Sequence, residues 1–210
     1  MAEEQSWTLV RGALAGIADL ANQYGSQGID LHFLHQEHYH QNIKTSHEVQ
    51  QIFDQMAPNG PETPTAAKLE ELINTYLPLV ERKFPRHNPI DIIVITDGVA
   101  TDQQALPEVI VSAAQRLERS QVPEGMFGLQ FVQIGTDAEA ALALRALDDH
   151  LEQQYKVRDI VDTTPYDPQQ GAFNTDYMLK ILLGGVNKVL DNGGPVPSEL
   201  LSIPVPYGPR

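Results

Sequence analysis

The chain of 210 residues is 41% hydrophobic and 20% charged, which supplies enough apolar material for one buried core and excludes a fully disordered chain. Its 28 acidic residues outnumber its 14 basic residues, and the net charge of -14 repels phosphate backbones and anionic lipids. We therefore expect no nucleic acid and no membrane among its partners. Because the sequence has no cysteine, disulfides and thiolate metal sites are excluded, and the expected location is cytoplasmic.

The first part of the chain predicts helices on either side of a strand. Apolar residues recur every three or four positions over 5–24, which predicts a helix with one stripe facing a core. The next segment, IDLHFL at 29–34, alternates in polarity and predicts a strand, followed by a polar loop over 35–45. A short helix is expected over 46–56, and a longer one follows Thr65 after a loop rich in proline and glycine.

A nearly unbroken apolar run, PIDIIVITDG at 89–98, predicts a strand that is buried on both faces at the centre of a parallel sheet. The elements expected after it are helices at 106–117, 138–151 and 176–190 and strands at 128–135 and 158–163. Strands thus alternate with helices along the chain. This order predicts an α/β fold, Rossmann-like and doubly wound, with a mostly parallel sheet and helices on both faces.

The sequence predicts one domain and a tail. Residues 1–192 contain neither an internal repeat nor a change in composition, so we expect them to fold as one unit. Residues 193–210 are rich in proline and glycine and have no hydrophobic period, which predicts an extended arm.

Oxygen-bearing side chains gather where the apolar run ends. Ligands of α/β folds bind beyond the carboxyl ends of the strands, and here the strand leads into Thr96, Asp97 and Asp102. The loop before the helix that follows Thr65 adds the hydroxyl of Thr63. Carboxylate and hydroxyl oxygens, without a glycine-rich phosphate loop, suit a hard cation such as Mg²⁺.

The segment VITDGVATD and the upstream segment ETPTAAKLEEL resemble the von Willebrand factor A (vWA) domain, a family shared with integrin I domains. The resemblance covers the whole predicted domain and implies a metal-ion-dependent adhesion site that holds Mg²⁺ or Mn²⁺. Thr63 and Asp97 match the family's threonine and aspartate ligands, Asp102 is adjacent but is not a ligand, and Thr65 fits a helix-capping role. Intact relatives use the metal to bind an Asp or Glu of a protein partner, so the resemblance implies a protein-binding module.

The chain departs from the family pattern at its start. The family's first strand carries an Asp-x-Ser-x-Ser motif, and Met1 stands where the residue after that strand would fall, so the strand and three ligands are lacking. The resemblance places that strand between those at 29–34 and 89–98, and its loss should leave backbone groups unpaired and an apolar slot open. The given sequence is then either a shortened form of a longer chain or a metal-free remnant that something else completes. The adhesion site is therefore expected to be degenerate or incomplete, with weak or absent metal binding.

The sequence offers less support for a transition-metal site, an enzyme or another kind of binding domain. His32, His35, His38 and His40 could suit Zn²⁺ or Cu²⁺, but they lack a fixed helical ligand spacing. The sequence has no nucleophile elbow, dinucleotide-binding or P-loop motif, so we expect no enzyme and assign no catalytic residue. The alternatives are a small-molecule-binding or catalytic Rossmann-like domain, marked by a pocket with perturbed carboxylates, and a structural subunit completed by a partner strand.

Overall fold

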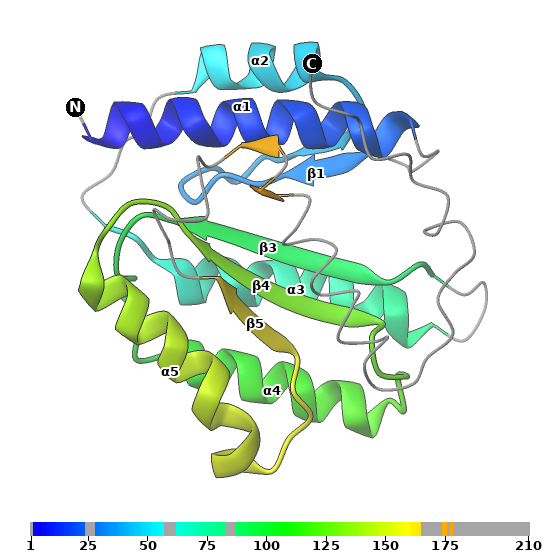
Figure 1. The fold of residues 1–210 in the computed structure, drawn as a ribbon. Helices are drawn as coiled ribbons and strands as arrows, with labels where there is room; N and C mark the ends of the chain where they lie inside the picture. Colours follow the sequence, from blue (N-terminus) through cyan, green and yellow to red (C-terminus); the bar gives the residue numbers. More distant parts are fainter. Residues whose placement is uncertain are drawn as a thin grey trace, which may run out of the picture.

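The computed structural model describes residues 2–23, 28–56, 62–82, 87–164, 174–175 and 177–178. Helices and strands follow one another through these ranges (Figure 1). In chain order the elements are α1 (Ala2–Gln23), β1 (Ile29–Leu31), β2 (His40–Ile43), α2 (Ser46–Gln55), α3 (Thr65–Glu81), β3 (Ile90–Thr96), α4 (Leu106–Arg119), β4 (Phe127–Gln133), α5 (Ala138–Tyr155) and β5 (Val161–Thr164).

These strands form two separate sheets. β1 and β2 make an antiparallel hairpin, whereas β3, β4 and β5 make a parallel sheet in that order. β3 and β4 pair along their whole length, from Ile90 opposite Phe127 to Thr96 opposite Gln133. β1 does not pair with β3, so the described strands do not join into one continuous sheet.

Helices α3, α4 and α5 cover one face of the parallel sheet. Their apolar stripes pack against Ile92 of β3, Phe131 of β4 and Val161 of β5. Burying a large apolar side chain contributes about 1.5–3 kcal/mol, so this layer is the main source of stability. The buried helix residues include Leu69, Ile73, Leu77, Ile110, Ala114, Leu117, Leu144 and Leu147.

Helix α1 lies on the opposite side and packs against both sheets (Figure 1). Ala13 and Ile17 are buried with Val132 at the end of the parallel sheet. Ala15 and Ala18, on the neighbouring side of the helix, are buried with residues of the hairpin and of α2. The described fold is therefore an α/β structure in which a three-stranded parallel sheet is flanked by helices, as the sequence predicts at this coarse level.

Strand β2 corrects the sequence-based prediction of a loop over 35–45. Its sequence, HQNI, has no hydrophobic alternation, so periodicity gives no strand signal there. Asn42 has a φ of 56°, a left-handed conformation that asparagine tolerates better than most residues. Its N–H donates to Oδ1 of Asp30 in β1 at 2.8 Å, so a side-chain contact helps to hold the hairpin together.

The position of β3 is a second correction. The sequence predicts this apolar strand at the centre of the sheet, but in the described chain β4 is central and β3 lies at an edge. Nearly every residue of β4 is buried, whereas Ile93, Val94 and Ile95 of β3 are only half-buried. The apolar run correctly indicates a strand with apolar side chains on both faces. Because β3 lies at the edge of the sheet, these side chains are only partly buried.

The other helices and strands predicted within the described ranges are present, with ends that differ by a few residues. The helix predicted at 176–190 and the tail at 193–210 lie outside the described residues, apart from Tyr177 and Met178, which are buried beside α1. None of the described helices is both long and apolar enough to cross a membrane.

Candidate functional site

The two loops that carry the predicted metal ligands lie side by side. The N–H of Thr63 donates to Oγ1 of Thr101 at 3.1 Å, and the N–H of Thr101 donates to the carbonyl of Thr63 at 3.0 Å. The loop after β3 is thereby tied to the loop before α3. Asp97 follows β3 directly and is exposed. These loops therefore meet at the carboxyl end of β3, and no hydrogen bond joins Thr63 to Asp97, whose role as metal ligands stays a prediction.

Asp102 caps α3, a role that the sequence analysis assigned to Thr65. The Oδ1 atom of Asp102 accepts the N–H of Ala66 and its Oδ2 atom accepts the N–H of Ala67, both at 3.0 Å. The Thr65 hydroxyl instead donates to the carbonyl of Thr63 at 3.4 Å. Two N–H groups at the positive end of α3 are thus satisfied by a carboxylate from another loop.

The remaining donors do not fit a resident Mg²⁺. With Asp102 engaged by α3, the two residues predicted as ligands offer one carboxylate, from Asp97, and one hydroxyl, from Thr63. One carboxylate and one neutral oxygen supply too little charge to draw Mg²⁺ out of its hydration shell. Among the residues that the structure describes, no group of three or more His, Asp or Glu side chains is placed to hold a metal. We therefore derive no chemical step through a metal.

Millimolar Mg²⁺ or Mn²⁺ is expected to change the melting temperature by less than about 1 °C, because an ion that binds the folded state weakly adds little stability. Differential scanning calorimetry with and without EDTA checks this. A rise of several degrees that is lost in Asp97→Asn would show instead that Asp97 holds the ion.

A cavity of about 300 Å³ lies beside these loops. Its wall is mostly apolar, and the described residues that line it include no ionisable side chain; the polar ones are Thr65, Thr96, Gln103 and Gln104. The perturbed carboxylates that would mark a catalytic pocket at the strand ends are therefore not part of this cavity.

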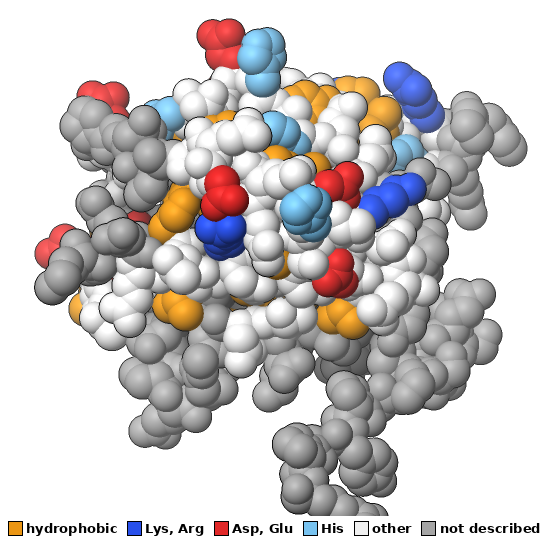
Figure 2. Space-filling view, turned by 90° about the horizontal axis from the view of Figure 1, so that it is seen from above, with side chains coloured by type: hydrophobic (Ala, Val, Ile, Leu, Met, Phe, Trp, Pro, Cys, Tyr) orange, Lys and Arg blue, Asp and Glu red, His pale blue; other side chains and the backbone are white. Residues whose placement is uncertain are grey.

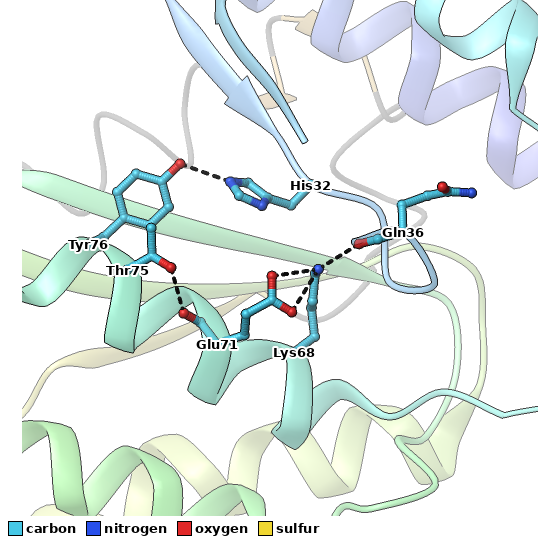
Figure 3. Close-up of polar contacts among 6 residues, drawn as sticks. All are labelled: His32, Gln36, Lys68, Glu71, Thr75 and Tyr76. Carbon is cyan, nitrogen blue, oxygen red and sulfur yellow. Dashed lines mark hydrogen bonds and ion pairs between the residues drawn. The ribbon is translucent and has the colours of Figure 1, made fainter. Parts of the chain in front are cut away.

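A hydrogen-bonded chain links the end of β1 to α3 (Figure 3). The hydroxyl of Tyr76 donates to Oδ2 of Asp30 at 2.7 Å, and Nε2 of His32 lies 2.8 Å from the same hydroxyl oxygen. Because Tyr76 has one proton to donate, His32 must carry its proton on Nε2 and donate it to Tyr76. This leaves Nδ1 of His32 as an acceptor, and that atom is buried and has no hydrogen-bond partner among the residues that the structure describes.

Burial favours the uncharged forms of His32 and Tyr76 in this hydrogen-bonded chain. Desolvation, followed by the positive charge of Lys68, lowers the pKa of His32. Desolvation, followed by the hydrogen bond to Asp30, raises the pKa of Tyr76. Lys68 itself donates to the Gln36 carbonyl at 2.8 Å and pairs with Glu71 at 2.9 Å (Figure 3). Together these contacts attach β1 and the loop after it to α3.

Two residues of the histidine stretch, His32 and His40, therefore make structural contacts, whereas His35 and His38 are exposed. His32 stacks on Tyr39, with ring centroids 4.2 Å apart, and His40 meets the ring of Phe33 edge-on. Sequence analysis singled out His32 but missed its partners Asp30 and Tyr76, which lie 2 and 44 residues away along the chain. No local spacing signals such a contact.

The edge of β3 that faces away from β4 has no strand partner in the described chain. The N–H of Ile90 donates to the carbonyl of Met126 at 3.0 Å, so even-numbered residues of β3 direct their backbone groups to β4. Successive residues of a strand direct these groups to opposite edges. Asp91, Ile93 and Ile95 therefore direct theirs to the edge that β4 leaves free, which we call the open edge.

This open edge is apolar on both sides of the sheet. Ile92 and Val94 pack with the α3–α4–α5 layer, and Ile93 and Ile95 pack with α1. A strand covered on both faces is typical of the interior of a parallel sheet. β3 therefore has the side chains of an interior strand in an edge position.

The face above α1 and α2 has a different character. Figure 2 shows acidic, basic and histidine side chains scattered there among hydrophobic ones. Arg11 of α1 pairs with Asp54 of α2 at 2.8 Å across this surface. A mixed surface of this kind is typical of a solvated face and does not indicate a ligand of one charge.

No family model, no curated protein and no solved structure matches this chain.

Proposed function

We propose that this chain is a non-enzymatic, protein-binding module of the vWA type with an incomplete adhesion site, and that it binds its partner by adding a strand to the open edge of β3. The observation that carries the proposal is the row of backbone groups at Asp91, Ile93 and Ile95, with apolar side chains on both sides of the sheet. Backbone hydrogen bonds give such an added strand affinity, and alternating side-chain contacts give it specificity.

The arrangement of the helices supports this mode of binding. α1 packs against both sheets from one side, and Tyr76 and Lys68 of α3 hold β1 and its following loop from the other. The two sheets are thus attached to the same helices without being hydrogen-bonded to each other. An inserted strand would complete the backbone pairing of β3 and would occupy the place that the family resemblance assigns to the family's first strand.

In this proposal the carboxyl end of β3 does not bind the partner through a metal. We take Thr63 and Asp97 as remnants of the metal site that the family resemblance implies, since one carboxylate and one hydroxyl do not fit Mg²⁺. The cavity beside them has no ionisable lining, which favours binding over catalysis.

Amide hydrogen exchange tests strand addition directly. In the free chain we expect the amides of Ile93 and Ile95 to exchange at least about 10-fold faster than those of Ile92 and Val94, whose N–H groups face β4. A labelled peptide of alternating Val and Ile with Gly-Ser flanks is expected to protect the Ile93 and Ile95 amides. The same peptide with a central proline, which cannot form the full pairing, is the matched control.

Two results would contradict the proposal. One is equal binding of the apolar peptide and its proline control, because binding would then not need strand pairing. The other is strong protection of the Ile93 and Ile95 amides in the free chain. If that protection falls on dilution, in parallel with a change in sedimentation, the occupant of the edge is a second copy of the chain.

A further inference from the structure

The open edge begins at a carboxylate that has no partner of opposite charge among the described residues. Asp91 is exposed, and it takes part in none of the hydrogen bonds or ion pairs of the described residues. Its side chain lies over Gly128 of β4, where an added Cβ would stand 3.2 Å from Oδ1 of Asp91. The carboxylate therefore stands on the α1 side of the sheet, at the amino-terminal end of the apolar edge.

The surroundings of Asp91 favour a positive charge. Where the carboxylate lies over Gly128 it loses part of its hydration, and this desolvation, followed by the negative charge of Asp162 on β5, raises the pKa of Asp91. A positive charge beside the carboxylate would offset both effects. Because Asp91 remains exposed, water screens part of this repulsion and a partner can still reach the carboxylate. The net charge of -14 also draws cationic segments toward the molecule.

We propose that the segment which pairs with the open edge carries a lysine or arginine opposite Asp91, followed by residues that are apolar on both faces. This inference rests on the strand addition proposed above. Neighbouring strands lie about 4.8 Å apart, and residues opposite one another point to the same face. A basic residue opposite Asp91 would therefore reach its carboxylate, while the following positions on that face would meet Ile93 and Ile95.

A double-mutant cycle tests the charge contact. The probes are two labelled peptides, Lys-Val-Ile-Val-Ile and Gln-Val-Ile-Val-Ile with the same Gly-Ser flanks, titrated by fluorescence anisotropy. On the unaltered chain, Lys→Gln in the peptide is expected to weaken binding by about 3- to 10-fold. On Asp91→Asn the same change is expected to weaken binding by less than about 2-fold.

Two further variants act as controls. Asp97→Asn removes an exposed carboxylate at the opposite end of β3 and should keep the full preference for lysine. Asp91→Glu keeps the charge and should retain most of that preference. Circular dichroism melts verify that each variant remains folded.

The outcomes separate the two proposals. Equal binding of both peptides to the unaltered chain overturns the basic-residue inference and leaves strand addition standing. Loss of the lysine preference in Asp97→Asn as well as in Asp91→Asn also overturns it, because overall charge would then explain the effect. If neither peptide binds, both the inference and the strand addition on which it rests are wrong.

Discussion

Replacing Asp102 with alanine is expected to lower the free energy of unfolding by about 1–2 kcal/mol. The carboxylate accepts the N–H groups of Ala66 and Ala67, and Ala66 is buried, so water cannot fully replace the lost acceptor. The substitution also removes a negative charge from the positive end of α3. Urea unfolding followed by circular dichroism measures the change.

Two matched variants show whether the loss of stability comes from the helix cap, from the lost negative charge or from a lost metal ligand. Asp102→Asn keeps one acceptor oxygen, so its loss should be roughly half that of Asp102→Ala. Asp97→Ala removes an exposed carboxylate from the same loop and is expected to change stability by less than about 0.5 kcal/mol. A larger loss in Asp97→Ala than in Asp102→Ala would refute the assignment of the cap.

Hydrophobic periodicity predicted the helices and strands whose apolar pattern lies within one continuous segment of the sequence. The stripe of α1 and the apolar run of β3 each produce a strong pattern within one segment. The hairpin strand β2 escaped prediction because it is polar and because Asn42 and Asp30 hold it through a side-chain contact. Hydrophobic periodicity gives no signal for a polar strand that is stabilised by a side-chain contact.

At the candidate site, too, local sequence motifs do not predict contacts between residues that are far apart in the sequence. Sequence motifs, through their resemblance to the vWA family, imply that Thr63 and Asp97 belong to one site, and hydrogen bonds between Thr63 and Thr101 bring their two loops together. The same motifs assigned the cap of α3 to Thr65, since capping is normally local, whereas the carboxylate that caps it comes from Asp102, 36 residues along the chain. Only the folded chain shows which acceptor reaches a given N–H.

The open edge depends on strand order, which no single segment encodes. An apolar run such as IDIIVIT indicates burial on both faces, but it does not say whether strands lie on both of its edges. Burial of β4 and the half-exposure of β3 distinguish the two cases in the fold. The mismatch between an interior-type sequence and an edge position is what makes β3 a candidate for binding.

Replacing Tyr76 with phenylalanine is expected to lower the free energy of unfolding by about 1–2 kcal/mol. The ring stays packed against the core, while the lost hydroxyl leaves Oδ2 of Asp30 and Nε2 of His32 without their partner. Because His32 is half-buried, its N–H recovers only part of that hydrogen bond from water. Chemical unfolding at neutral pH measures the loss.

Tyr39→Phe is the matched control for this prediction. Tyr39 also lies against His32, as a stacked ring, but its hydroxyl makes an exposed hydrogen bond with the side chain of Gln41. Removing that hydroxyl should cost less than about 0.5 kcal/mol. Equal losses in the two variants would mean that the chain from Asp30 through Tyr76 to His32 adds no more stability than an exposed contact. β1 would then be attached to α3 chiefly through Lys68 and the Gln36 carbonyl.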